Sequence, residues 1–499
     1  MTFTAQSAAA GTYPVTIQAS DGVSKGTADV SLTVAIVATI ATTTNTLVGE
    51  GGKLEDFMTT SFQPASWSDQ FFINHPDTSV LNNLGAQHIR IQALERDVPM
   101  TSATTWDFSH LDAMVNPILS VTDHSPEFQI AVAPSWMNDA SGHLIMATHL
   151  QDFADYCANL VRYYNTGGFD AIGTHYKSSS TYPITWWGIF NEPNINGLSA
   201  AQYVQLYNAV VPAMQAVDPT IKFSAVELAD FSDWPQQYMP EFVSGVTAQV
   251  DIVSTHFYST CNHLDSDQQL FNTIPGFVND IKYIYSQLAT NPALANVPVW
   301  VTENNVNADF NRGDGLSNCS GTPFVTDQRG TSGSFAAWRP YVFSQLSQAS
   351  VQALYHWDYN ADAQYGEVDG GTGQIYRSYW VDYWLARYFP SHIGTSILDM
   401  NVTDNSTVET LAVQRADGSV VVMIANRAVH APSDDNGPGD PRTAIVDLSA
   451  WPAFSTASLL TIDATTDPAG GPVAVPVTPA LRLTVKFNGY GVAFLQLTP

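Results

Sequence analysis

The sequence contains 499 residues, a length that favours two or three domains and allows a large core. Lys and Arg number 18 against 46 Asp and Glu, and the resulting net charge of −28 would repel phosphate backbones and anionic membranes. No apolar run approaches the ~20 residues that a membrane-spanning helix needs. We therefore expect no nucleic acid and no membrane among the partners.

Charged residues make up only 13% of the chain, and uncharged polar residues are abundant. This composition favours a secreted protein, although the first residues, MTFTAQSAAAGTYPV, have neither the basic end nor the apolar centre of a signal peptide. The three cysteines are too few for a disulfide framework. Cys157 lies in a stretch with helical spacing and is expected in the core, whereas Cys261 and Cys319 lie in polar loops and would pair if those loops are neighbours.

The N-terminal stretch has a strand, turn and strand pattern. Alternating apolar residues occupy 13–19 and 28–34, and Asp21-Gly22 lies between them. The pair resembles the last two strands of an immunoglobulin-like module, so residues 1–38 are expected to form a partial, short immunoglobulin-like β segment. The Thr-rich stretch ATIATTTNT, residues 38–46, is interpreted as a linker or an edge strand.

From about residue 60 to 390, short apolar runs alternate with longer segments of helical periodicity, such as 199–217 and 276–290. Eight such βα units predict a (β/α)8 TIM barrel, which we assign to residues 39–390. A doubly wound open sheet is the alternative, but no G-x-G-x-x-G motif follows the first strand. The expected strands are 86–94, 127–136, 184–190, 222–228, 250–258, 297–303 and 351–359, with a weaker one near 58–67.

No long helical pattern follows residue 391. Residues 409–428 predict a hairpin that turns at Asp417-Gly418, and residues 481–498 predict two closing strands. We therefore expect residues 391–499 to form an antiparallel β-sandwich.

Two glutamates end predicted barrel strands. Glu192 follows the fourth strand in WWGIFNEPNI, and Glu303 ends the seventh in VWVTENN. They are 111 positions apart, or 37 for each of three βα units, which suits opposite sides of one catalytic rim. Strand alternation then predicts that Val299, Val301 and Glu303 face the barrel centre while Trp300 and Thr302 face the helices.

Two carboxyl groups at one rim are what the hydrolysis of a glycosidic bond requires, because one protonates the leaving oxygen while the other attacks the sugar carbon or activates water. Glu227 also ends a predicted strand and is the rival nucleophile. Its strand, however, is adjacent to that of Glu192 instead of three units away.

The segments FNEPN (190–194), DIVSTHFY (251–258) and VWVTENN (299–305) resemble clan A glycoside hydrolases and are most similar to family 39, the β-xylosidase and α-L-iduronidase family. The resemblance covers about residues 58–390 and extends through the sandwich. It implies a retaining, exo-acting, β-xylosidase-like enzyme that acts by double displacement on sugars derived from plant or microbial polysaccharide. The alternatives are an arabinofuranosidase, a galactosidase or an endo-glycanase of the same clan, or a non-catalytic carbohydrate-binding protein.

The resemblance also implies a role for individual residues. Glu192 would be the general acid/base and Glu303 the nucleophile, with Asn191 hydrogen-bonded to the sugar 2-hydroxyl. Arg90 would keep Glu303 ionised and Tyr258 would orient it. Further sugar contacts are expected from His256, Asn305, Trp357 and Trp136, with core packing as the alternative for the two tryptophans.

Two positions depart from the family pattern. Asn304 stands where a Trp usually follows the nucleophile, and Gln92 stands where a His usually lies two residues beyond Arg90. Since both positions lie close to the sugar in that pattern, the substrate is expected to differ from a xyloside or iduronide, while the two-glutamate chemistry need not change.

No cofactor or metal is expected. The chain has no CxxC or other zinc spacing. The loop NHLDSDQQ (262–269) lacks the glycine and the terminal glutamate of an EF-hand, and we interpret it as a solvated loop.

Overall fold

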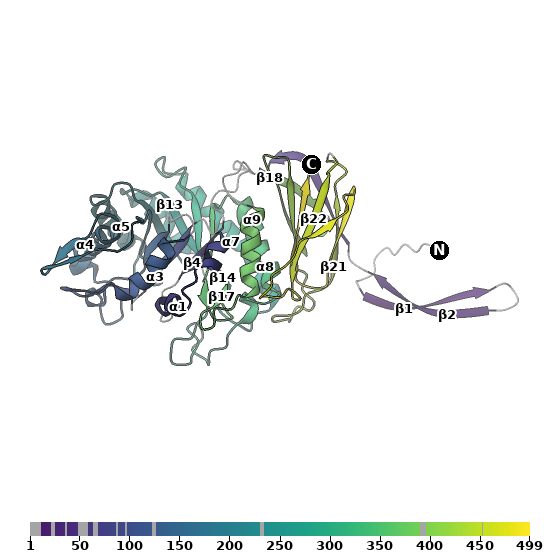
Figure 1. Cartoon of the computed structure of the whole chain (residues 1–499), viewed down its shortest axis with the longest axis horizontal. Coiled ribbons are helices and arrows are strands. Elements are labelled where there is room, and N and C mark those ends of the chain that lie inside the picture. The colour runs from purple at the N-terminus through teal and green to yellow at the C-terminus, as the bar shows by residue number, and fades with distance from the viewer. Residues whose placement is uncertain are drawn as a thin grey trace.

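The computed structural model describes residues 11–20, 25–34, 37–47, 58–62, 68–85, 88–94, 97–121, 126–229, 234–389, 396–451 and 453–499. These residues form an N-terminal hairpin, a barrel and a β-sandwich (Figure 1). Among them, no helix has the length and apolar character needed to cross a membrane.

Eight parallel strands close into a barrel, and their order around it follows the order of the chain. All eight apolar runs that predicted strands contribute one, including the weak run near 58–67. The TIM barrel is therefore confirmed. The strands are β4 (Met58–Phe62), β5 (Ile89–Ala93), β8 (Glu127–Ile130), β11 (Trp186–Ile189), β12 (Lys222–Leu228), β13 (Ile252–Thr260), β14 (Val299–Asn307) and β15 (Ala353–His356).

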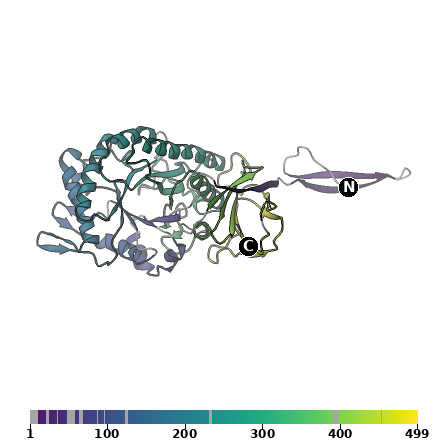
Figure 2. The ribbon, with the colours of Figure 1, turned by 90° about the horizontal axis from the view of Figure 1, so that it is seen from above.

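Helices surround the barrel strands (Figure 2). The two helices predicted at 199–217 and 276–290 are α5 and α7, and each begins at a capping box in which a serine and a glutamine three residues later satisfy each other's backbone amides. The described helices are α1 (Ser68–Asn74), α2 (Ser79–Leu84), α3 (Ser109–Leu119), α4 (Met146–Asn165), α5 (Ala200–Gln215), α6 (Trp234–Gly245), α7 (Asp267–Leu288), α8 (Phe335–Gln348) and α9 (Arg377–Tyr388).

Short elements decorate the loops between these units. They are the strand pairs β6 (Met100–Ser102) and β7 (Thr105–Trp106), β9 (Phe169–Ala171) and β10 (Thr174–Tyr176), and β16 (Asn360–Ala361) and β17 (Val368–Asp369), with the 3-10 turns η2 (Ser135–Met137) and η3 (Gln328–Gly330).

One nine-stranded sheet forms the sandwich, in the order β23-β22-β25-β20-β19-β18-β3-β21-β24. Strands far apart in this order share one core, where Ile424 of β20 joins Val446 of β21 and Val485 of β24, so the sheet folds over on itself. The strands are β3 (Val37–Leu47), β18 (Ser396–Val402), β19 (Val408–Gln414), β20 (Val420–Asn426), β21 (Arg442–Asp447), β22 (Thr456–Asp463), β23 (Val475–Val477), β24 (Arg482–Phe487) and β25 (Gly491–Thr498).

Strand β20 packs one face against the sandwich core and the other against the barrel and its helices. Val422 and Ile424 face the sandwich core, while Val421 and Met423 belong to the core cluster of the barrel and its helices. Burial on both faces explains the uninterrupted apolar run VVVMIA of this strand. The predicted hairpin is confirmed, because β19 and β20 pair antiparallel around Gly418, which has a φ of +82°.

The Thr-rich stretch at 38–46 is neither a linker nor an edge strand. It forms most of β3, which lies between β18 and β21 and pairs in parallel with β21. Ile40 is fully buried in the sandwich core, and this burial gives the stretch its place. The expected boundary at residue 39 therefore puts this strand in the wrong domain. The two closing strands are present, but β24 pairs with β21 and β25 with β20 and β22.

The N-terminal segment contains the expected strand pair. β1 (Gly11–Ser20) and β2 (Lys25–Val34) are antiparallel, and their register places Val15 opposite Val30 and Ile17 opposite Ala28. The turn predicted at Asp21-Gly22 lies outside the described residues. The likeness to an immunoglobulin module stays a prediction.

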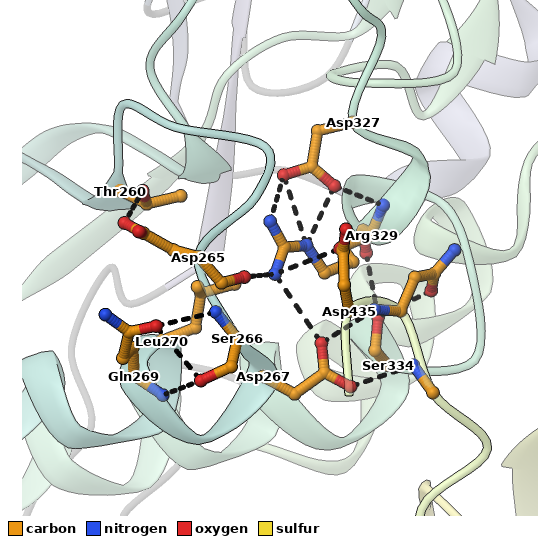
Figure 3. Close-up of polar contacts among 12 residues, drawn as sticks. Thr260, Asp265, Ser266, Asp267, Gln269, Leu270, Asp327, Arg329, Ser334 and Asp435 are labelled. Atoms are coloured by element: carbon orange, nitrogen blue, oxygen red, sulfur yellow. Dashed lines mark hydrogen bonds and ion pairs between the residues drawn. The ribbon is translucent and has the colours of Figure 1, made fainter. Parts of the chain in front are cut away.

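Arg329 lies at the contact between barrel and sandwich (Figure 3). Its Nε and Nη2 donate to the Asp327 carboxylate, the latter at 2.6 Å. Its Nη1 lies 3.5 Å from Asp267 at the start of α7 and 3.5 Å from Asp435 in a loop of the sandwich. One guanidinium thus bridges carboxylates from both domains.

Asp267 completes this contact. Its two oxygens accept the backbone amides of Asn436 and Gly437, each at 2.9 Å, and the hydroxyl of Tyr490 at 3.2 Å. The side chain is only 2% exposed. The loop 262–269 is therefore not a solvated loop throughout, because its aspartate at 267 is buried in the interface between the domains.

Candidate active site

The two predicted catalytic glutamates meet at the carboxyl end of the barrel. Glu192 follows β11, and Glu303 lies within β14. One carboxylate oxygen of each, together with one ring nitrogen of His256, lie within 4.8 Å of one another. The side chain of Glu192 is 15% exposed and that of Glu303 is 6% exposed. The cluster is therefore largely buried, with an opening on the side of Glu192.

A bulge in β14 turns Glu303 toward this cluster. The register pairs Val301 with Thr255 and then Glu303 with His256, which leaves Thr302 as an extra residue. Thr302 also faces the barrel interior, where its hydroxyl donates to Glu227 at 2.9 Å.

The alternation predicted for β14 is therefore wrong below the bulge. Trp300 faces the centre, where its ring lies 4.8 Å from Trp186, 5.1 Å from His88 and 6.1 Å from Tyr355. Val299 and Val301 instead join the core cluster that includes the surrounding helices. Inserting one residue exchanges the two faces of a strand, and the sequence pattern alone does not reveal the insertion.

A second irregularity places Glu227. In β12 Ala225 pairs with Val253 and Leu228 pairs with Thr255, so this stretch of β12 has one residue more than β13. Within it, Val226 and Glu227 have φ values of +81° and +47°. Phe190 and Glu192 also have positive φ, at +66° and +44°. Such conformations are rare outside glycine and gather at functional sites, where surrounding contacts maintain them.

Three donors hold the Glu303 carboxylate. Arg90 Nη1 donates to Oε1 at 2.8 Å and Gln92 Nε2 donates to the same oxygen at 3.2 Å, while the Tyr258 hydroxyl donates to Oε2 at 2.9 Å. Burial, and then the charge of Glu303, raises the pKa of Tyr258, so the phenol keeps its proton and stays a donor. Glu303 is oriented on both oxygens.

Asn191 is fixed through its carbonyl. Its Oδ1 accepts from Arg90 Nη2 at 3.1 Å and from Gln129 Nε2 at 3.0 Å. Both lone pairs of this oxygen are therefore used, and the orientation of the amide follows from its two donors. The Nδ2 hydrogens remain for a ligand.

His256 lies between three glutamates. Its Nδ1 is 2.8 Å from Glu192 Oε1 and 3.4 Å from Glu303 Oε2, and its Nε2 is 3.4 Å from Glu227 Oε2. Burial alone would lower the pKa of His256, but the charge of Glu303 and the hydrogen bonds to Glu192 and Glu227 raise it to about 9. Burial also raises the pKa of Glu192, against the opposing effect of His256.

The sequence matches the model of glycosyl hydrolases family 39 over residues 53–313, which is more than half of the chain. The chain belongs to this family. No curated protein sequence matches it significantly. With the family and the barrel together, the protein is a glycoside hydrolase with a carbohydrate substrate.

Solved structures share the fold of this family 39 enzyme. A monomeric β-xylosidase from Caulobacter crescentus CB15 has a TM-score of 0.63 at 16% identity, covering 93% of this chain and 100% of that one. The family 39 enzyme from Xanthomonas axonopodis pv. citri has a TM-score of 0.57 at 15% identity, covering 93% and 97%. A family 51 arabinofuranosidase from the same organism has a TM-score of 0.64 at 11% identity, covering 93% and 100%. These low identities show a common fold.

The two tryptophans predicted to contact the sugar, Trp357 and Trp136, lie in different surroundings. Trp357 follows β15, and its ring lies 6.0 Å from the guanidinium carbon of Arg90, beside the glutamate cluster. Trp136 lies in η2 after β8, where its ring packs edge-on against His149 at 5.3 Å. The structure thus places Trp357 beside Arg90 at the edge of the glutamate cluster and Trp136 against α4.

Asn305 is not free to hold a sugar. Its Nδ2 donates to the carbonyls of Trp357, at 2.5 Å, and Tyr365, at 3.1 Å, and its Oδ1 accepts the amide of Val306. The side chain is fully buried. Asn305 therefore anchors the loop after β15, because both amide hydrogens are committed to backbone.

The two departures from the family pattern have opposite outcomes. Gln92 points into the site and donates to Glu303, so it lies beside the predicted nucleophile. Asn304 points away from the site, donating to the Phe257 carbonyl at 2.7 Å and accepting from Arg339 at 2.5 Å. A side chain that faces α8 cannot contact the sugar, and Asn304 therefore has no direct part in specificity.

Gln129 and Glu127 also belong to the site, but the sequence did not predict them there. Their strand positions pair with Gln92 and Arg90 of β5, so all four side chains lie on one face, toward the barrel centre. The available signal was the alternation of polar residues in two otherwise apolar strands, IRIQA and EFQI.

The disulfide between Cys261 and Cys319 is present and links the loops that follow β13 and β14, and Cys157 is buried as expected. A further buried group, His356, Glu367 and Asp382, has the geometry of a metal site. Both ring nitrogens of His356 are already engaged, by Asp382 at 2.9 Å and by the Tyr365 carbonyl at 2.7 Å, so this group does not suit an ion.

Proposed function

We propose that this glycoside hydrolase retains the anomeric configuration, with Glu303 as nucleophile and Glu192 as general acid/base. The observation that carries the proposal is the separation of at most 4.8 Å between their oxygens. Retaining enzymes hold the two carboxyl groups ~5–5.5 Å apart, whereas inverting enzymes need ~6.5–9.5 Å to admit a water. The short separation leaves no room for that water.

In the first step Glu303 attacks the anomeric carbon while Glu192 gives its proton to the glycosidic oxygen. The bond between this carbon and this oxygen breaks, and the alcohol leaves. In the second step water attacks the same carbon, Glu192 takes the proton of that water, and the ester to Glu303 breaks. The raised pKa of Glu192 supports the acid role, because the group keeps its proton until the leaving oxygen needs it.

The residues around the glutamates would bind and orient the sugar. Asn191 Nδ2 would donate to the 2-hydroxyl, because its carbonyl is already fixed by Arg90 and Gln129. His256 would add a polar contact, and the ring of Trp357 would pack against one face of the sugar. Arg90 and Tyr258 would keep the nucleophile aligned as its charge is used.

The proposed substrate is a terminal sugar of a plant or microbial polysaccharide fragment, released in a β-xylosidase-like, exo-acting reaction. The family match supports this class, and one structural neighbour is described as a monomeric β-xylosidase. A panel of nitrophenyl glycosides that includes xylosides, arabinofuranosides and galactosides, with polymeric xylan as the endo substrate, decides among the alternatives. We also propose secretion, supported by the disulfide, since such bonds persist in oxidising compartments.

The mechanism is tested with Glu192→Gln and Glu303→Gln on the best activated aryl glycoside. We expect each to lower kcat at least ~10³-fold, because each removes a group on which bond breaking depends. Glu241→Gln, an exposed glutamate of α6, is the matched control and keeps wild-type activity. NMR of the first-formed sugar should show the anomer of the substrate. Full activity in both variants, or inversion, would overturn the proposal.

A further inference from the structure

Glu227 touches both cations of the site yet presents no atom to a substrate. Its side chain is 0% exposed. Ser224 and Thr302 donate to its two oxygens, at 2.5 and 2.9 Å. Its Oε2 also lies 3.4 Å from Arg90 Nη2 and 3.4 Å from His256 Nε2. Such a group acts on the reaction only through the residues that it holds.

His256 presents opposite edges to Glu227 and to the proposed catalytic pair. Nδ1 faces Glu192 at 2.8 Å and Glu303 at 3.4 Å, whereas Nε2 faces Glu227. The carboxylate of Glu227 thus sits behind the imidazole, where it favours a proton on Nε2 and stabilises a positive ring.

The backbone ties Glu227 to Glu192 as well. The amide of Glu192 donates to the carbonyl of Glu227 at 3.0 Å, and both residues have positive φ. A Cβ at Gly188 of β11 would lie 3.0 Å from Glu227 Oε1 and 2.7 Å from Gln129 Cγ. The absence of a side chain at Gly188 therefore leaves the space that the Glu227 carboxylate occupies.

We propose that Glu227 is a positioning residue for the acid–base step: its carboxylate holds His256 from behind, so that one proton stays between the imidazole and Glu192 until the glycosidic oxygen takes it. This inference rests on the proposed function of Glu192. When the alcohol leaves, the proton leaves with it. The attacking water of the second step returns one proton to Glu192, and the pair is restored.

The charges around His256 agree with this role. Glu192, Glu227 and Glu303 face it directly, Arg90 and Tyr258 reach it through Glu303, and Glu127 lies behind Glu227. Burial alone would raise the pKa of Glu227, but Arg90 and then His256 and Ser224 lower it to about 2. Burial and the charge of Glu227 raise the pKa of Glu127 to about 8. Near neutral pH, Glu227 is therefore ionised while Glu127 is neutral.

The test is the pH profile of kcat between pH 4 and 8 for Glu227→Gln. This variant keeps the size of the side chain and an acceptor oxygen that can face His256, but it removes the negative charge. The loss of charge lowers the proton affinity of the His256–Glu192 pair. We expect the alkaline limb of the kcat profile to shift to lower pH by about one unit or more. Glu227→Asp keeps the charge and should leave the limb near its wild-type place. Glu127→Gln is the matched control, since it replaces a neighbouring buried carboxyl that stays neutral until the pH nears 8.

Glu192→Gln and Glu303→Gln are assayed alongside. If both are inactive and the limb of Glu227→Gln does not move, this inference is overturned while the proposed function stands; if both are active, the proposed function itself fails. If azide rescues an otherwise inactive Glu227→Ala and the glycosyl azide formed has the anomeric configuration opposite to that of the substrate, Glu227 is the nucleophile and both proposals are overturned.

A measurement on the wild-type enzyme covers the case in which Glu227→Gln does not fold. With 13C-labelled histidine, the His256 signal is assigned by its loss in His256→Asn. We expect Nε2 to carry a proton through pH 6 to 7, and a ring whose Nε2 has no proton at pH 6 would overturn the inference.

Discussion

Arg90 and Arg329 are both buried among carboxylates, the first at the mouth of the barrel and the second where the barrel meets the sandwich. Arg90 lies within 3.4 Å of Glu227 and Glu303, and Arg329 lies within 3.5 Å of Asp267, Asp327 and Asp435. Burying such ions is costly unless every charge is compensated. In both places carboxylates outnumber the arginine, so the excess negative charge must be balanced by something else.

The two places balance it differently. At the interface, backbone amides and hydroxyl groups complete the shell, as the amides of Asn436 and Gly437 do for Asp267. At the mouth, protons and an ionisable ring take this part: the pKa values of Glu192 and Glu127 are raised, and that of His256 is raised to about 9. Fixed dipoles make a permanent joint, whereas protons can be given away, which is what a general acid requires.

The largest expected effect is that of Arg90→Met on catalysis. It removes one of the two donors of Glu303 Oε1 and one donor of Asn191, so we expect kcat to fall at least ~10³-fold on an activated aryl glycoside. The pH dependence of the residual activity should also change, because Arg90 lowers the pKa of Glu227, and without it Glu227 takes up a proton at higher pH. Wild-type kcat in this variant would show that the arginine is structural, like Arg329.

The same substitution at the interface should have the opposite outcome. Arg329→Met leaves buried carboxylates without their cation, and we expect the free energy of unfolding to fall by about 3–5 kcal/mol. Turnover by the folded protein should stay within about twofold of wild type, since Arg329 lies outside the site. Denaturant unfolding and initial rates measure the two quantities.

Asp435→Asn supplies the control for that measurement. Its carboxylate is 43% exposed, so its loss should cost under about 1 kcal/mol. Equal losses from Asp435→Asn and Arg329→Met would mean that Asp267 and Asp327 do not depend on the arginine, and the comparison between the two clusters would fail.

The same contrast explains what the sequence could predict. The eight strands and the two rim glutamates follow from local periodicity and from the spacing of βα units, which a single sequence carries. The bulges at Thr302 and Glu227 do not, because an extra residue is defined only against the neighbouring strand. The sequence therefore predicted the wrong side chains of β14 for the barrel centre, although it placed Glu303 itself correctly at the mouth.

Long-range partners account for the other differences. Residues 38–46 have the composition of a linker, and only the distant strands β18 and β21 make them an inner strand of the sandwich. Asn304 and Asn305 follow the nucleophile in sequence, yet one faces Arg339 and the other holds backbone carbonyls. The roles of two neighbouring residues at the end of a strand therefore depend on the groups that they contact in the fold. A sequence motif does not contain that information.

The smallest expected effect tests whether protons balance the charge at the mouth. In the unfolded chain the Glu127 carboxyl has an ordinary pKa near ~4.3, while burial and the charge of Glu227 raise it to about 8 in the folded enzyme. The folded state therefore binds more protons between these values. The stabilisation from this group is complete below the lower value and is lost as the pH rises toward the upper one. Over that window the wild type should lose on the order of 2–4 kcal/mol from Glu127.

Glu127→Gln removes this dependence, so its free energy of unfolding should approach that of the wild type near pH 4.5 and exceed it increasingly up to pH 8. Denaturant unfolding at several pH values measures the difference, and the exposed Glu241→Gln should show none. A constant difference at every pH would mean that Glu127 is already ionised in the folded state. An ionised Glu127 would face the ionised Glu227 with no proton between the two carboxylates. The negative charge at the barrel mouth would then have to be balanced without protons, as it is around Arg329.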